Sequence, residues 1–328
     1  MNRRGFTAAL AGAAAWPLTG HAQQAERVRR VGVLNAFLEN DPVNRATLTA
    51  FAGALEPLGW VEGENIRIDY RFASGDRALF KTYAAELVNL SPDAILASTP
   101  PAVAALREQT RTIPIVFVFV VDPVGLGFTQ SLARPGGNIT GFGALDPPMM
   151  GKWLQLLKEV APNVTRVSII FNPDTQPYAR FFNSAIEAAA PSMEIAVTLA
   201  PVRDDTAIQE AIAAQAPEPG GGLVCLPASF TGTHRDAIIA AAALHGLPLI
   251  GVEVFPRAGG LMSYWYDAVE LHAEAASYID RILKGATPAD LPVQQATKYS
   301  LIINLKTARA LGLTVPPSML QLADEVIE

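Results

Sequence analysis

The stretch Ile113–Gly143, IPIVFVFVVDPVGLGFTQSLARPGGNITGFG, decides the fold that we expect for this chain. Its first part is an apolar run to Val121 that only Pro114 interrupts. A strand this apolar is typical of the middle of a sheet that is covered on both faces. Asp122 follows directly, at the carboxyl end of the strand, where ligands bind in open α/β sheets. Asp-Pro is also a common turn opener, so the stretch leaves a ligand role and a turn or capping role open for Asp122.

Short strands and helical segments alternate on both sides of this stretch. Before it, strands are predicted at 29–36, 65–73 and 93–98. The apolar run of the stretch itself is the fourth strand, and residues 138–143 form a fifth. Helical patterns separate the first four strands. Strands separated by helices of this length predict right-handed βαβ crossovers and a parallel sheet.

The same order of elements restarts after residue 143. Strands are predicted at 165–172, 193–202, 220–229 and 248–253, again with helical segments between them. The two halves repeat an architecture without an alignable repeat of sequence. We therefore predict an α/β protein of two Rossmann-like lobes with parallel sheets and a ligand cleft between the lobes.

The C-terminal part predicts that the chain crosses between the lobes more than once. We expect lobe 1 to comprise residues 28–143 and 261–285, and lobe 2 to comprise residues 144–260 and 286–328. Several crossings form a multi-strand hinge, about which one lobe can rotate to close around a ligand.

The N-terminus has the anatomy of an export signal, and residues 1–22 are interpreted as a signal peptide. Arg3 and Arg4 form a basic start, an Ala-rich apolar segment follows, and small residues precede a cleavage site after Ala22. The Arg-Arg-Gly-Phe start also resembles a twin-arginine signal. The apolar segment is too short for a membrane anchor, and the alternative is a basic tail without structure. We expect a periplasmic protein that is cleaved near Ala22.

Composition excludes several classes of function. The 328-residue chain has a formal charge of −6, and without the signal it keeps 23 basic and 31 acidic side chains. Such a balance, without a basic cluster, does not favour nucleic acid or anionic lipid, and no second apolar stretch predicts membrane insertion. Cys225 is the only cysteine, so an intrachain disulfide is excluded; it is interpreted as a buried apolar residue rather than a reactive thiol. We expect a monomer.

Catalytic signatures are missing from the sequence. No HExxH, GxSxG or P-loop occurs, and no GxGxxG follows the first strand. His234, His245 and His272 are isolated, without the spacing of zinc ligands. We therefore predict no enzymatic activity, no metal and no cofactor.

Polar residues at strand ends are the positive signal for a ligand site. Seven lie at or just beyond the carboxyl ends of predicted strands: Asn35, Ser98, Thr99, Asp122, Asn172, Asp174 and Ser229. Hydroxyl groups and free backbone N–H groups at a helix start can hold a carboxylate, and a carboxylate such as that of Asp122 can pair with an ammonium. Each residue taken alone could equally cap a helix or a turn.

Aromatic residues near the same ends could supply an apolar wall. These are Tyr178, Tyr264, Trp265 and Tyr266. Trp265 could equally belong to the core of the lobe.

Several motifs spread over most of the chain resemble one known family. They are LGWVEGENIRIDYR, IPIVFVFVVDPVGLGFTQSLARPGGNITGF, GKWLQLLKEVAP, FNPDT, GGLMSY and YIDRILKGATPADLPVQQATKYSLIINLKTARALGLTVPP. With them the chain resembles the bacterial extracytoplasmic solute-binding proteins of ABC transporters, in the type I group that includes tryptophan- and tyrosine-binding members. The resemblance implies two Rossmann-like lobes joined by three crossings. It also implies delivery of a small ligand to a membrane permease that a cytoplasmic ATPase drives.

The resemblance implies ligand contacts at six places. They are the loop after Asn35, the Ser98-Thr99 turn, Asp122, the loop from Asn172 to Tyr178, the region of Ser229 and the segment Tyr264–Asp267. The chain departs from the family pattern at Trp265, where glycine is usual, and at Ala228, where aspartate is frequent. Because both departures lie near the expected cleft, an aromatic amino acid is not transferred as the ligand.

These observations together predict an extracytoplasmic solute-binding protein of an ABC importer. Its expected ligand is a small polar metabolite, with an amino acid or a related carboxylate as one candidate. Two alternatives stay open: an enzyme on the same two-lobe scaffold, since fold alone does not establish function, and a ligand-sensing module that acts with a separate membrane partner.

Overall fold

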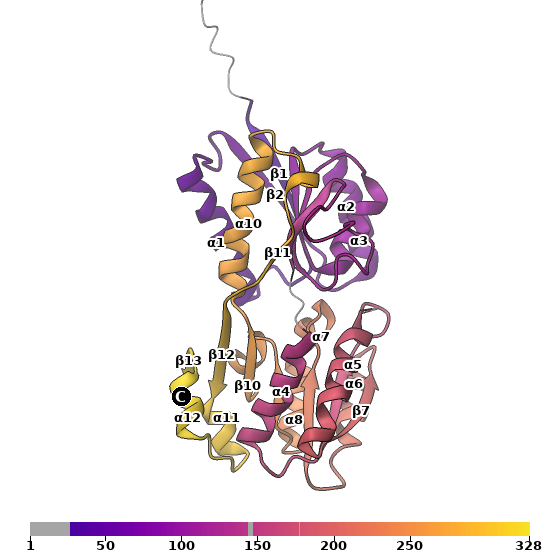
Figure 1. Cartoon of the computed structure of the whole chain (residues 1–328), viewed down its shortest axis with the longest axis vertical. Helices are drawn as coiled ribbons and strands as arrows, with labels where there is room; N and C mark the ends of the chain where they lie inside the picture. The colour runs from indigo at the N-terminus through magenta and orange to yellow at the C-terminus, as the bar shows by residue number, and fades with distance from the viewer. Residues whose placement is uncertain (1–26, 144–146, 177) are drawn as a thin grey trace, which may run out of the picture.

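The computed structural model describes residues 27–143, 147–176 and 178–328, so the predicted signal peptide lies outside the described residues. The described chain forms two α/β lobes that follow one another along the longest axis of the molecule (Figure 1). Each lobe is built on one sheet with helices on both faces. The predicted fold class, two Rossmann-like lobes of the type I periplasmic-binding-protein kind, is confirmed.

Lobe 1 contains a six-stranded sheet whose strands pair in parallel, in the order β11-β5-β4-β3-β1-β2. Its strands are β1 (Arg29–Asn35), β2 (Ile66–Phe72), β3 (Ala94–Ser98), β4 (Ile115–Val120), β5 (Ile139–Gly143) and β11 (Gln294–Gln295). One face carries α1 (Pro42–Leu55) and α10 (Ala268–Leu283), and the other carries α2 (Arg77–Asn89) and α3 (Thr99–Gln109). This double cover explains why β4 is apolar on both faces, as the sequence predicts.

Lobe 2 contains a seven-stranded sheet in the order β13-β12-β10-β9-β8-β6-β7, in which only the β10–β12 pair is antiparallel. Its strands are β6 (Arg166–Phe171), β7 (Ala196–Pro201), β8 (Gly221–Cys225), β9 (Leu249–Gly251), β10 (Met262–Tyr266), β12 (Tyr299–Asn304) and β13 (Glu325–Ile327). Its α-helices are α4 (Pro147–Val160), α5 (Ala179–Ala189), α6 (Asp205–Ala213), α7 (Ser229–Thr233), α8 (Arg235–Leu244), α9 (Val254–Arg257), α11 (Leu305–Ala310) and α12 (Pro317–Leu322). The described chain also contains three short 3₁₀ turns. Two follow helices of lobe 1, η1 (Glu56–Leu58) after α1 and η3 (Pro288–Asp290) after α10, and η2 (Ala190–Met193) follows α5 of lobe 2.

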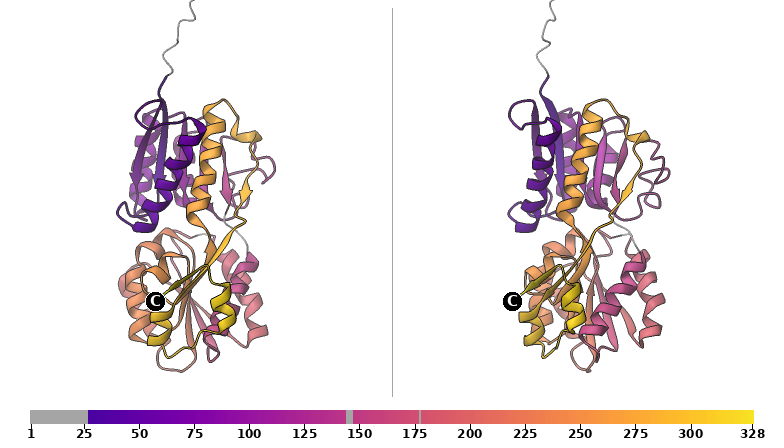
Figure 2. Two further views of the ribbon diagram at one scale, coloured as in Figure 1. Left: turned by 90° about the vertical axis from the view of Figure 1, so that its left-hand side faces the viewer. Right: turned by 60° about the vertical axis from the view of Figure 1, so that its left-hand side comes forward.

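The structure corrects the predicted lobe boundaries within residues 261–295. β10 was expected in lobe 1, but it pairs with β9 and β12 in the sheet of lobe 2, where Met262 and Trp265 are buried. α10, which follows at once, packs on α1 in lobe 1, and β11 was expected in lobe 2 but pairs with β5. The chain therefore changes lobe between β5 and α4, between β10 and α10, and between β11 and β12 (Figure 2). Pairing partners decide lobe membership here, and local pattern does not reveal them.

A β-bulge near the end of β4 turns one aromatic side chain toward the other lobe. The register of β4 against β5 shifts between Val118 and Val120, and Phe119 between them has a φ of 61°. Strict alternation would place Phe119 beside Phe117 in the core under α2 and α3, whereas it packs with the cluster under α10. Gly141 of β5 permits this geometry, because its φ is 150° and a Cβ there would lie 2.1 Å from the Phe117 carbonyl oxygen.

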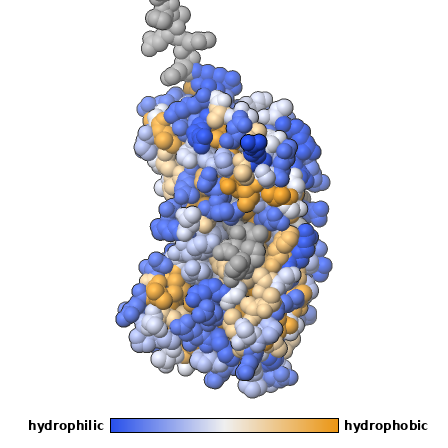
Figure 3. Space-filling view, viewed as in Figure 1, coloured by the Kyte–Doolittle hydropathy of each residue, from blue (hydrophilic) through white to orange (hydrophobic). Residues whose placement is uncertain are grey.

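The surface on the face shown in Figure 3 is mainly hydrophilic, with apolar side chains in separate patches. Among the described residues, no helix is both long and apolar enough to span a bilayer.

Candidate functional site

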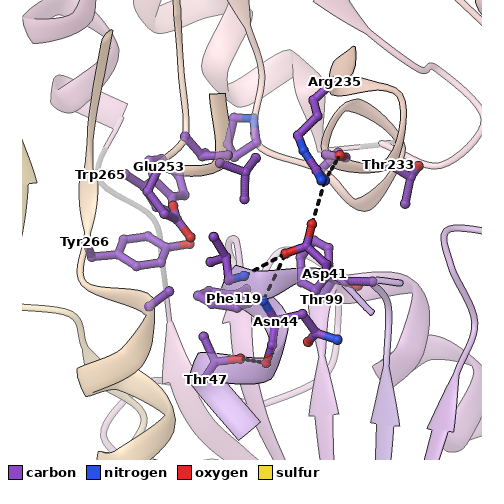
Figure 4. Close-up of a pocket in the computed structure, with 18 of the residues that line it drawn as sticks. Asp41, Asn44, Thr47, Thr99, Phe119, Thr233, Arg235, Glu253, Trp265 and Tyr266 are labelled. Atoms are coloured by element: carbon purple, nitrogen blue, oxygen red, sulfur yellow. Dashed lines mark hydrogen bonds and ion pairs between the residues drawn. The ribbon is translucent and has the colours of Figure 1, made fainter. Parts of the chain in front are cut away.

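A cavity of about 70 Å³ lies between the two lobes, beside the crossing from β10 to α10 (Figure 4). Lobe 1 contributes the loop after β1, the start of α1 and the ends of β3 and β4. Lobe 2 contributes the ends of β8 and β9, the α7–α8 corner and the end of β10. The cavity thus lies at the carboxyl ends of the parallel strands of both sheets, which is the expected ligand position in such folds.

An ion pair joins the lobes beside this cavity. Asp41 caps α1, where its Oδ1 accepts hydrogen bonds from the backbone N–H groups of Val43 (2.9 Å) and Asn44 (3.0 Å). Its Oδ2 lies 2.7 Å from Nη1 of Arg235, at the start of α8 in lobe 2. The two side chains are only 5% and 18% exposed. Because solvent screens a pair this buried only weakly, it holds the lobes together more firmly than a surface pair would.

A second close approach between the lobes lies next to this pair. The turn at Gly75 of lobe 1 faces α7 of lobe 2, where a Cβ on Gly75 would lie 3.4 Å from Oγ1 of Thr233. The lobes are therefore in contact on the side of the cavity where Asp41 and Arg235 meet, which is a closed arrangement.

Five aromatic rings form part of the apolar wall. Phe119 of lobe 1 stacks on Tyr266 of lobe 2 with 5.6 Å between ring centroids, and the edge of Phe37 packs against it at 6.2 Å. Tyr178 and Trp265 line the same cavity. Such rings can hold a planar or apolar ligand body, since they offer large area with little loss of conformational entropy.

Apart from Oδ2 of Asp41, which forms the ion pair with Arg235, two buried polar atoms of the wall lack a hydrogen-bond partner within the described chain. One is Oγ1 of Thr99, a residue that is 4% exposed and has a φ of 77°. The other is Oε2 of Glu253, which follows β9. Buried polar atoms are nearly always paired, and strained backbone is concentrated at ligand sites, so both residues are candidates for ligand contact.

Burial also perturbs the protonation of the wall. Loss of solvation raises the pKa of Glu253 to about 7, while its own backbone N–H and Arg257 oppose the rise and Asp267 and Asp41 add to it. Burial likewise raises the pKa of Tyr266 well above its usual value, and the charge of Glu253 adds to the rise. The two groups meet at one side of the cavity in Figure 4. Perturbed ionisable groups of this kind are typical of functional sites.

Four of the twelve predicted ligand residues line the cavity: Thr99, Tyr178, Trp265 and Tyr266. Three others belong to lobe 1 and lie outside the lining: Asn35, Ser98 and Asp122. Asn35 and Ser98 hold the loop after β1. Asn35 donates to Oδ1 of Asn44 (2.8 Å) and accepts from the Phe37 N–H (2.8 Å), while Ser98 Oγ accepts from the Ala36 N–H (2.9 Å). Both therefore hold the first loop in place.

Asp122 adopts the turn role that the sequence left open. It lies outside the lining of the cavity, and its Oδ1 accepts a hydrogen bond of 2.8 Å from the Gly125 N–H. Its φ of 45° is a conformation that Asp tolerates in turns. The predicted pairing of Asp122 with a ligand cation is not supported by this geometry.

Predicted residues of lobe 2 outside the lining have structural partners. Oδ1 of Asn172 accepts from the N–H groups of Asp174 (2.9 Å) and Thr175 (3.1 Å), and Asp174 pairs with Arg203 at 2.9 Å. These contacts fix the loop after β6. Ser229 is buried at the start of α7.

Two residues at the end of β10 also lie outside the lining of the cavity. Tyr264 stacks on Tyr299 with 5.6 Å between centroids. Asp267 caps α10 by accepting from the Val269 and Glu270 N–H groups, each at 3.0 Å, and it pairs with Lys298 at 3.2 Å. Burial acts to raise the pKa of Asp267, but these partners outweigh it and lower the pKa.

Sequence reasoning missed several residues that the structure places at the cavity. Glu253 ended a predicted strand, so the rule applied to the other strand ends would have found it. Asp41 precedes Pro42, a typical helix start, and could have been recognised as a cap in the first βα loop. Phe119 and Arg235 gave no local signal, because a bulge and the contact between lobes bring them in.

Within the described ranges, no group of three or more His, Cys, Asp or Glu side chains is arranged to hold a metal ion.

The chain belongs to the family described as ABC transporter substrate binding protein, whose model matches residues 30–327. The members of this family are solute-binding proteins rather than enzymes.

Known relatives share both sequence and fold with this chain. It is 25% identical over 290 residues to a protein named "Tyrosine-binding protein" from Clostridioides difficile, covering 88% of this chain and 82% of the relative. A crystal structure of a conserved domain protein from Vibrio cholerae has a TM-score of 0.84 at 29% identity, over 92% of this chain and all (100%) of that one. An ABC domain in complex with L-Trp from a Streptococcus has a TM-score of 0.83 at 24% identity, over 91% and 99% of the two chains.

Proposed function

We propose that this protein captures a small metabolite in the cavity between its lobes and delivers it to the permease of an ABC importer outside the cytoplasm. The observation that carries the proposal is the ion pair between Asp41 and Arg235, which joins the lobes across the cavity at 2.7 Å. A cavity that two lobes must close to complete can bind a ligand and signal its presence through the lobe arrangement.

Closure would couple binding to delivery in a simple way. The wall residues come from both lobes, so a ligand that touches both favours the closed state over the open one, by the difference between its affinities for the two states. The permease, driven by a cytoplasmic ATPase, would then bind the closed, ligand-bound protein and take up the ligand from it. The role is non-catalytic.

The proposed ligand is a small polar metabolite such as an amino acid or a related compound. Aromatic rings supply a wall for its body, while Thr99 and Glu253 offer polar atoms without partners. The names of the tyrosine-binding relative and of the L-Trp complex support an amino acid. Trp265 occupies part of the wall, however, and packs edge-on against Trp153 at 5.7 Å, so the ligand body has to fit around it.

The proposal includes export and removal of residues 1–22. Mass spectrometry of the protein from its native host should find an N-terminus near Gln23. An intact Met1 in the mature protein would contradict it.

A thermal-shift screen of the mature protein against amino acids, amines, small acids, nucleosides and sugars tests the function. A ligand at 100 times its dissociation constant should stabilise the protein by about 2.7 kcal/mol. X-ray scattering with the ligand should then show that ligand saturation populates a compact, closed form. If no solute of this panel stabilises the protein, the capture function is refuted.

A further inference from the structure

One carboxylate oxygen in the cavity wall has no hydrogen-bond partner among the described residues. Glu253 follows β9 and reaches the cavity from lobe 2, and its Oε2 is buried and accepts no hydrogen bond from the described chain. An isolated carboxylate in such a place is costly, because transfer from water disfavours the charged form. A ligand that brings a hydrogen-bond donor or a positive charge to this oxygen would offset part of that cost.

Three cations of the neighbouring elements are paired with other acids. Arg235, which lines the same cavity, is bound to Asp41 at 2.7 Å. Arg257 pairs with Glu325 at 2.7 Å on the surface. Lys298 is held between Asp267 at 3.2 Å and Glu270 at 2.9 Å. Among the described wall residues, Glu253 therefore contributes a carboxylate that forms no ion pair, although the charge of Arg257 acts on it.

The rings beside Glu253 suit a positive charge. Tyr266 carries its hydroxyl toward the Glu253 carboxyl, and Trp265 lies on the same side of the cavity in Figure 4. Ring faces attract cations, but Phe119 stacks on Tyr266 at 5.6 Å and Trp265 packs against the same ring at 4.3 Å. Tyr266 therefore contributes its hydroxyl, and Trp265 contributes the ring that lines the cavity. A negatively charged ligand group in this position would be repelled by the carboxylate of Glu253. Arg235 would compensate little of this repulsion, because its guanidinium is already paired with Asp41.

We propose that Glu253 is the counter-ion for a cationic nitrogen of the ligand, which defines the solute as a small molecule with a protonated amine on a planar or apolar body. This inference rests on the proposed capture function. Glu253 determines specificity by charge, and the rings of Tyr266 and Trp265 select the body that carries the amine.

Binding of such a ligand depends on pH, because Glu253 must be ionised to pair with the amine. The charged and titratable groups that act on it are Asp41, Asp267, Arg257 and the phenol of Tyr266. With the pKa of Glu253 near 7, affinity should fall about 10-fold between pH 8 and pH 6 as the carboxyl takes up a proton.

Matched pairs of probes test the inference on the mature protein. Calorimetric titration at pH 8 would compare L-tyrosine and tyramine with 3-(4-hydroxyphenyl)propionate, and L-tryptophan and tryptamine with indole-3-propionate. Probes with the amine should bind at least 30-fold more tightly than those without it. Equal affinity within each pair, or binding by no amine probe, overturns the inference.

Glu253→Gln removes the charge and keeps the shape of the side chain. It should weaken binding of the best amine probe at least 30-fold and abolish the pH dependence, while Glu39→Gln, an exposed acid of the first loop, should leave both unchanged. Full retention of affinity by Glu253→Gln overturns the inference. If the broad solute screen instead finds a neutral or anionic ligand that closes the lobes, the capture function stands and the cation inference alone falls.

Discussion

The ion pair between Asp41 and Arg235 gives a direct test of how the lobes are held closed. Arg235→Ala removes the guanidinium that lies 2.7 Å from Oδ2 of Asp41, in a pair whose side chains are 5% and 18% exposed. Breaking a fully buried pair costs roughly 3–5 kcal/mol, whereas an exposed pair contributes about 0–1 kcal/mol. Asp41 keeps the two backbone N–H groups that it caps, which compensate part of the loss. We therefore expect about 1–3 kcal/mol, between the two limits.

This free energy belongs to lobe closure rather than to the stability of either lobe. A change of about 1–3 kcal/mol shifts the closed-to-open ratio roughly 5- to 150-fold. X-ray scattering of the ligand-free variant should show a larger radius of gyration than the wild type. Affinity for any ligand found in the screen should fall by a similar factor, because binding has to offset the lost closure energy.

A matched control separates this effect from a general loss of charge. Arg203→Ala breaks the pair of Arg203 with Asp174, at 2.9 Å, which lies wholly within lobe 2 and whose side chains are 59% and 53% exposed. It should change neither the radius of gyration nor the affinity. An Arg235→Ala variant with wild-type scattering and wild-type affinity would show that the interlobe pair does not contribute to closure.

Three further predictions concern single residues. The folded-state pKa of Glu253, about 7, is raised above its ordinary value of 4.5, so the contribution of this carboxyl to stability is fully present below pH 4.5 and is lost as pH rises through 7. Denaturant titrations should show that the Glu253→Gln variant is more stable than the wild type at pH 8 but not at pH 4. The same difference in stability at both pH values would contradict the assignment. Asp122→Ala should cost about 1 kcal/mol through loss of the turn hydrogen bond and leave ligand affinity unchanged, whereas a 10-fold loss of affinity by calorimetry would restore its ligand role. Gly141→Ala should cost roughly 2–4 kcal/mol in thermal or chemical unfolding, because its φ of 150° and the Phe117 carbonyl leave no room for a Cβ. The control Gly137→Ala, with no atom within 4 Å of the added Cβ, should be near neutral. Equal stability of the two variants would mean that the bulge does not depend on glycine.

Much of the architecture follows from local pattern. The apolar run before Asp122 predicts a central strand because burial on both faces requires apolar residues at every position, and β4 has helices on both sides. The rule that ligands bind beyond strand ends likewise found Thr99, Tyr178 and Tyr266 at the cavity.

The amino-acid pattern alone therefore predicts the class of fold, the repeated lobes and the edge of each sheet that faces the cavity. These depend on the periodicity of apolar residues and on the chain direction of parallel strands, which are local properties. Strand pairing between distant segments places β10 in lobe 2, and the bulge turns Phe119 into the cavity, neither of which local pattern predicts. Only the tertiary structure brings Arg235 to Asp41 while Glu253 stays unpaired, since the partner of a charge depends on where distant elements place the other charges.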